Sequence, residues 1–132
     1  MNHTSHFINA DFEIESHYSL DVLVHELESS LCLLHYAKYG NKRFRATFET
    51  NDPWTPKVTP EKIILKICEH LESLSKQAKN DLKKSIIRRF DLGFEGNGGK
   101  QNFNTSITVP TLKRISHLGC DIAITIYRIA KN

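Results

Sequence analysis

The chain has 132 residues, of which 39% are hydrophobic and 25% are charged, a size and composition that fit one globular domain over residues 1–132 and exclude a disordered chain. The N-terminal residues lack the basic start and apolar run of a secretory signal, and no segment is long and apolar enough to cross a membrane, so we expect a cytoplasmic protein. The net charge of +3 is unevenly spread, because residues 1–30 contain six acidic side chains and no lysine or arginine, an asymmetry that can orient a charged partner.

The first predicted element is a half-buried strand over residues 8–15. Apolar and polar residues alternate there without a break, and the polar side of the strand is acidic. Ser19 is expected to cap a helix that runs to about residue 29, with Asp21 in the first turn, where the helix dipole favours negative charge.

Two further strands and a loop are predicted next. The apolar run over residues 31–36 is interpreted as a strand, and residues 44–49 alternate like the first strand. Gly40 and its neighbour are expected to form the hairpin turn between them. The loop that follows contains Trp54, which we expect to fold back on the core, although an exposed binding anchor is the alternative.

A long helix is predicted from about residue 60 to residue 85. Thr59 supplies a capping hydroxyl, Pro60 stands where no N–H is needed, and an acidic residue follows in the first turn. Apolar residues at helical spacing predict one buried stripe along its length. Its last two turns carry the lysines Lys76, Lys79, Lys83 and Lys84.

The last third of the chain predicts a strand, a loop, a short helix and a strand. Residues 89–95 alternate as a fourth strand, and the glycine-rich segment 96–99 begins a loop that ends near Thr108. Thr108 is expected to cap a helix that Gly119 ends, and residues 122–127 form the last strand.

This order predicts an α+β fold, with a ferredoxin-like βαββαβ sheet, helices packed on one face, and an added C-terminal αβ unit. Because alternation places the polar residues on one face of the sheet, we expect the face opposite the helices to be open to solvent. The residues predicted on the open face are Asp11, Glu13, Glu15, Arg45, Glu49, Arg89, Asp91 and Glu95. This face is interpreted as a surface that docks a basic protein, as a divalent-metal site, or as a solvated face on which arginines pair with the acids.

The motifs of common chemistries are missing. The sequence has no HExxH, no Cys/His pair with zinc spacing, no GxSxG and no phosphate-loop pattern, so we expect neither an enzyme nor a cofactor. The three cysteines are widely spaced, which indicates buried free thiols. An RNA-recognition motif is only superficially similar to residues 42–48, because Phe44, Ala46 and Phe48 share the face expected to be the core. The lysine-rich helix end leaves RNA binding as an alternative.

Both ends of the chain resemble a group of small bacterial domains. The opening ADFEIES followed by SLDVLVHEL, and the ending TVPTLKRISHLGCDIAITIY, are similar to those of domains found among immunity proteins of polymorphic toxins, including contact-dependent growth inhibition. The resemblance implies a protein that binds and occludes a cognate toxin domain, and it transfers no functional residues. Immunity proteins against basic nucleases tend to be acidic, whereas this chain is slightly basic overall.

The sequence therefore predicts a binding protein of the immunity type, with a small enzyme or ligand-binding domain and an RNA-binding module as alternatives. The residues expected to contact the partner are Asp11, Glu13, Glu15, Asp91 and Glu95.

Overall fold

The computed structural model describes residues 6–96 and 102–128. The elements follow one another as β1 (His6–Ser16), α1 (Asp21–Glu28), β2 (Leu31–Tyr39), β3 (Arg43–Thr50), α2 (Pro60–Glu72), α3 (Lys76–Lys84), β4 (Ile87–Gly96), α4 (Val109–His117) and β5 (Asp121–Arg128). Within these residues no helix is long and apolar enough to cross a membrane.

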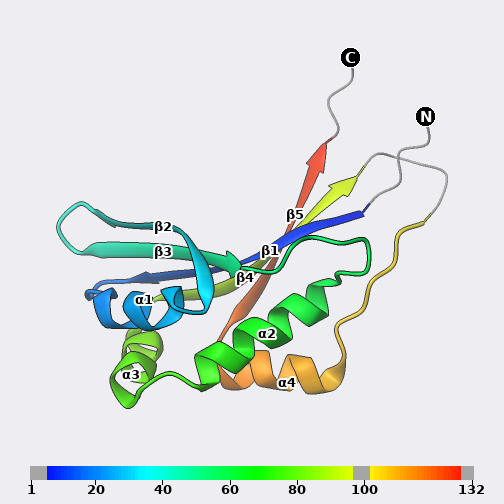
Figure 1. Ribbon diagram of the computed structural model, residues 1–132. Helices are drawn as coiled ribbons and strands as arrows, with labels where there is room; N and C mark the ends of the chain where they lie inside the picture. The colour runs from blue at the N-terminus through cyan, green and yellow to red at the C-terminus, as the bar shows by residue number, and fades with distance from the viewer. Residues whose placement is uncertain (1–5, 97–101, 129–132) are drawn as a thin grey trace.

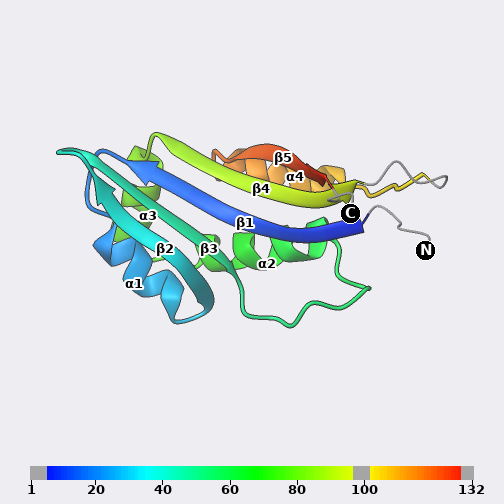
Figure 2. The ribbon, with the colours of Figure 1, turned by 90° about the horizontal axis from the view of Figure 1, so that it is seen from above.

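The strands form one mixed sheet in the order β2-β3-β1-β4-β5. β1 lies at the centre and is antiparallel to both β3 and β4, β2 is antiparallel to β3, and β5 is parallel to β4. The helices all lie on one side of the sheet, as Figures 1 and 2 show. The α+β class is thus confirmed, while the fifth, parallel strand makes this sheet different from a four-stranded antiparallel ferredoxin-like sheet.

The core lies between the helices and the apolar side of the central strands. Phe12, Phe48 and Phe90, one from each of the three central strands, are fully buried, as are Ile64 and Ile67 of α2. Because side chains of a strand alternate between its two faces, burying these positions leaves the intervening charged residues on the other side of the sheet. The alternation in the sequence therefore predicts the two faces correctly.

The expected long helix over residues 60–85 is wrong, because the helix is interrupted between α2 and α3. Ser73 ends α2, and Ser75 begins α3 by accepting a hydrogen bond from the N–H of Ala78. The Glu26 carboxylate of α1 accepts further bonds from the Ser75 N–H (2.8 Å) and hydroxyl (2.5 Å). These caps compensate for the helical bonds lost at the break and hold α3 against α1.

The predicted helix ends are present in part. The cap of α1 is Leu20 and not Ser19, although the Ser19 hydroxyl accepts a hydrogen bond from the Asp21 N–H at 3.2 Å. Thr59 accepts a hydrogen bond from the Lys62 N–H at the start of α2. Gly119 follows α4 with a φ of +71°, a conformation that glycine adopts without strain. Thr108 does not cap α4 with its side chain; its N–H and hydroxyl instead donate to Glu61 at the start of α2.

Arg88 at the start of β4 connects the ends of two helices. Its guanidinium donates to the carbonyl oxygens of Leu82 (3.2 Å) and Ser85 (2.6 Å) at the end of α3, and to that of Gly119 (3.0 Å) after α4. The planar guanidinium satisfies several terminal carbonyls that a helix leaves without partners.

Two loop expectations have different outcomes. Trp54 is 54% exposed, and its ring lies edge-on to the His6 ring at a centroid distance of 6.5 Å, so the expectation that it packs on the core is wrong. The glycine-rich segment 96–99 lies, apart from Gly96, outside the described residues.

Candidate protein-binding face

Three carboxylates lie next to one another across the open face of the sheet, and we call them the carboxylate row: Glu49 of β3, Asp11 of β1 and Asp91 of β4. Asp11 is the direct register partner of Asp91. On the other side of β1, Phe12 pairs with Phe48, which places Glu49 beside Asp11. Like charges directly opposite one another destabilise a sheet, so this arrangement opposes folding at neutral pH.

Asp11 is the most perturbed member of the carboxylate row. Burial, followed by the charges of Glu49, Asp91 and Glu13, raises its pKa from 3.8 to about 6. Its Oδ1 is buried without a hydrogen-bond partner among the described residues. Asp91 accepts a hydrogen bond from the Thr125 hydroxyl at 2.9 Å. No member of the row forms a direct ion pair within the described part of the chain, so the row concentrates negative charge that is balanced only in part, by Arg89 near Asp91.

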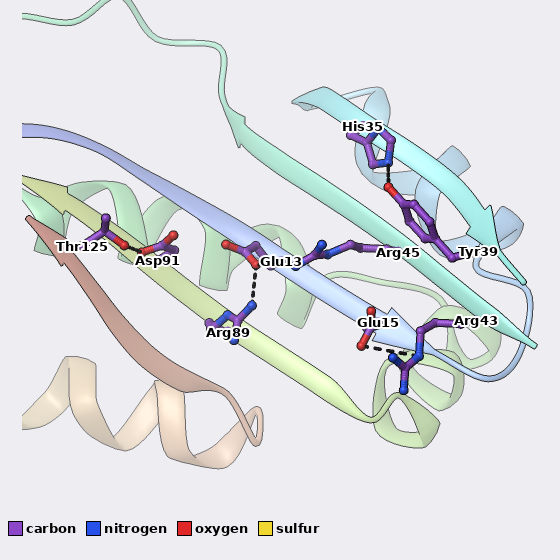
Figure 3. A network of polar contacts seen from close by, with 9 residues as sticks. All are labelled: Glu13, Glu15, His35, Tyr39, Arg43, Arg45, Arg89, Asp91 and Thr125. Carbon is purple, nitrogen blue, oxygen red and sulfur yellow. Dashed lines mark hydrogen bonds and ion pairs between the residues drawn. The ribbon is translucent and has the colours of Figure 1, made fainter. Parts of the chain in front are cut away.

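Glu13, the next acidic residue on the open side of β1, has its negative charge balanced by two arginines. The Arg89 guanidinium donates to Glu13 at 2.7 Å, and Arg45 lies 3.7 Å from the same carboxylate oxygen (Figure 3). The bond to Glu13 raises the pKa of Arg89, to which the charge of Asp91 also contributes. In this part of the open face arginines pair with the acidic residues, which is one of the three interpretations that the sequence allowed.

The remaining two expected contact residues lie toward opposite ends of the face. Glu15 is only 9% exposed, and its carboxylate lies 3.9 Å from the Arg43 guanidinium. Glu95 lies 3.4 Å from the His6 ring near the other end of β1. All five expected residues are thus on the open side of one sheet, but Asp11 and Asp91 are the two that stand together without an ion pair among the described residues.

Besides the arginines, this face includes Glu49, Thr125 and Tyr39, which lie outside the expected contact set. The alternation of β3 places Glu49 on the face, and only the register with β1 shows that it stands beside Asp11. Thr125 belongs to β5, whose position next to β4 was not predicted. Tyr39 of β2 is hydrogen bonded to His35 at 2.5 Å at the margin of the face (Figure 3).

The described residues offer little for the alternative chemistries. No group of three His, Cys, Asp or Glu side chains in residues 6–96 and 102–128 is arranged to hold a metal ion. Burial raises the pKa of Cys68 to about 11 and that of Cys120 to about 12, so both thiols stay protonated at neutral pH. All three cysteines are free, and Cys68 and Cys120 are buried as expected, whereas Cys32 is only partly buried.

An aromatic platform for RNA is not formed by β3. Phe48 is fully buried and Phe44 packs against the core, so their rings face the helices and not solvent, as the sequence predicts. The lysine cluster is exposed on α3, on the helical side of the sheet. That position separates it from the carboxylate row.

Comparisons with known proteins give no relative. No family model matches the chain, and no curated protein or solved structure is significantly similar to it.

Proposed function

We propose that this chain is a binding protein that docks a basic surface of another protein on the open face of its sheet. The observation that carries the proposal is the carboxylate row, in which Glu49, Asp11 and Asp91 stand side by side across three strands without a direct ion pair among the described residues. A lysine or arginine of a partner would relieve their mutual repulsion and supply the buried Asp11 oxygen with a donor.

Within this proposal the expected contact residues have different roles. Asp11 and Asp91 form the centre, and Glu95 extends the surface toward the end of β4. Glu13 and Glu15 contribute less charge, because Arg89, Arg45 and Arg43 lie beside them. Those arginines restrict the uncompensated charge to one part of the face, and this favours a partner with a confined basic patch.

The resemblance of both chain ends to small bacterial domains supports one class of partner. We propose an immunity protein that binds a cognate toxin domain and blocks it by covering its surface, as in contact-dependent growth inhibition. Such a protein acts in the cytoplasm by binding and not by catalysis. The part β2-β3-β1-β4 with α1 and α2 is proposed to be a ferredoxin-like unit, extended by α4 and β5.

The test is binding to the protein encoded by the neighbouring gene, measured by calorimetry at low, physiological and high salt. We expect tight binding that weakens as salt rises, with the association rate falling first. Asp11→Asn/Asp91→Asn should weaken binding at least tenfold. The matched control Glu69→Gln/Asp81→Asn removes two charges from the helical side and should bind like the wild type.

Two results would contradict this reasoning in different ways. An affinity that is unchanged between low and high salt, or a double Asn variant that binds normally, excludes the carboxylate row as the docking surface. If the chain does not bind the neighbouring gene product, the proposal of an immunity protein loses its support, while the proposal that the carboxylate row docks a basic protein is not contradicted.

A cavity favours a small ligand as the second candidate. A space of about 370 Å³ lies between β1 and the loop after β3, lined by residues that include Asn9, Glu49, Trp54 and Lys62. Trp54 is the only tryptophan of the chain, and it also lines a neighbouring cavity with Phe7 and Phe103, so its fluorescence reports on these two cavities. A small molecule that shifts the emission of Trp54 at micromolar concentration would favour this function over protein docking.

A further inference from the structure

The last strand of the sheet has one open edge. β5 pairs with β4 over its whole length, and no strand of the described residues pairs with its other side. Proteins usually protect such edges with lysine, proline or a bulge. Between Asp121 and Arg128, β5 has six uncharged residues in a row, no proline and no irregularity in its pairing.

The opposite edge of the sheet is better protected. β2 has a bulge between Leu33 and His35 and carries Lys38 further along the strand. A bulge twists an edge away from new partners, and a lysine introduces a charge into any added pairing. Of the two edges, β5 is the one available for a further strand.

The exposed side chains of β5 are apolar. Ile124 and Ile126 face the helical side of the sheet and are 65% and 67% exposed. The C-terminal half of β5 rises away from α4, so the helical layer does not cover these side chains (Figure 1). On the other face, Tyr127 is half exposed and lies close to Gly93 of β4. The unpaired backbone N–H and C=O groups of this edge can bond to another strand, and its exposed isoleucines can pack against the isoleucines of a strand with the same composition.

We propose that a second copy of this chain pairs with β5 in antiparallel orientation about a two-fold axis, which joins two sheets into one. Because paired residues must share a face, the axis passes through a residue and not between two residues. With Ile124 on the axis, Ile122 lies opposite Ile126 of the other copy, and the isoleucines of both copies form one continuous stripe. On the other face Asp121 lies opposite Tyr127 of the other copy.

The charges at the ends of β5 favour this orientation. A parallel pair would place Asp121 beside Asp121 and Arg128 beside Arg128 of the other copy. The antiparallel pair brings Asp121 of one copy to the end where Arg128 of the other lies. It also closes as a dimer, whereas pairing β5 with β2 of another copy would continue without end.

A pair of eight-residue strands is a small interface. Its total area falls below about 1,200 Å², the lower limit of stable complexes, so association is expected to be weak, with a Kd on the order of 10–100 µM. The dimer would therefore be populated only at protein concentrations near or above this Kd.

Sedimentation velocity of the full chain from about 1 to 500 µM tests the proposal. The weight-average mass should rise from that of one chain toward that of two. Ile124→Lys places two ammonium groups on the axis and should weaken association at least tenfold, while its circular dichroism spectrum stays that of the folded chain, since Ile124 is already exposed. The matched control Leu34→Lys alters an exposed residue of β2 and should dimerise like the wild type.

A second arm tests the register. In a chain with Cys32→Ala, Ile124→Cys should form a disulfide-linked dimer under mild oxidation, because a residue on the axis meets its own copy. Leu34→Cys in the same background should not. A chain that stays monomeric at every concentration overturns the proposal, as does a dimer that Ile124→Lys leaves intact or that Leu34→Lys abolishes.

Discussion

Replacing Asp11 by asparagine should stabilise the fold at neutral pH, although it changes a residue at the centre of the sheet. The folded structure raises the pKa of Asp11 from 3.8 to about 6, first through burial and then through the charges of Glu49 and Asp91. A shift of about two units corresponds to about 3 kcal/mol of differential stability. Asp11 keeps some contact with water, so solvent and salt screening reduce this to about 1–2 kcal/mol.

The sign of the effect follows from which state holds the proton. Between pH 4 and pH 6 the folded chain binds the proton of Asp11 more tightly than the unfolded chain, so its contribution to the free energy of unfolding decreases as the pH rises. Above pH 6 the penalty is complete, and below pH 4 it disappears. Asp11→Asn should therefore gain its 1–2 kcal/mol at pH 7.5 and match the wild type near pH 4.

Urea denaturation followed by circular dichroism at pH 4, 5, 6 and 7.5 checks this. With a slope on the order of 1–2 kcal/mol/M, the midpoint at pH 7.5 should rise by about 1 M. The exposed control Glu69→Gln should stay within about 0.5 kcal/mol at each pH. Glu49→Gln should lower the pKa of Asp11 in an NMR titration. A variant Asp11→Asn that is no more stable at pH 7.5, or equally stabilised at pH 4, would refute the electrostatic explanation.

Three further outcomes follow from the helix ends and the thiols. Arg88→Lys should lower the free energy of unfolding by about 2 kcal/mol in urea titrations, because an ammonium group cannot reach the carbonyls at both helix ends at once. Gly119→Ala should cost about 1 kcal/mol, seen as a lower Tm, since φ is +71° and the new methyl group would lie 3.2 Å from the Arg88 guanidinium. Cys68 and Cys120 should react with a thiol reagent at pH 8 only as the chain unfolds, and mass spectrometry after partial labelling should find Cys32 modified first.

The sequence predicts the faces of the sheet better than the neighbours of each residue. Strict alternation in β1, β3 and β4 is sufficient to assign Phe12 to the core and Asp11 to the open side. Alternation has no information on register, however, and register decides which open-side residues meet. Glu13 lies beside Arg89 and is compensated, whereas Asp11, two residues earlier, lies beside Asp91 and is not.

The elements that the sequence misplaces depend on contacts between distant segments. The stripe of apolar residues continues through residues 73–75, and the helix ends there because Ser75 caps α3 and bonds to Glu26. The exposure of Trp54 likewise depends on where the loop after β3 runs relative to β1. Local propensity does not include such contacts.

Raising the salt concentration should affect the two proposed interactions of this chain differently. A basic partner would contact the carboxylate row directly, whereas the carboxylate rows of two copies in the dimer lie far apart. A two-fold axis perpendicular to the sheet keeps both carboxylate rows on the same face of the joined sheet. The two copies of Asp91 would then be three strand spacings, about 14 Å, apart across the strands and two residues apart along them, which exceeds the Debye length of about 8 Å at 0.15 M salt. Raising salt from about 0.15 to 0.5 M should therefore leave self-association unchanged or slightly stronger, while it weakens the binding of a basic partner several-fold. Parallel sedimentation and calorimetry over this range would reveal the difference, and a parallel loss of both interactions would show that the dimer, too, is held by opposite charges and not by the isoleucine stripe of β5.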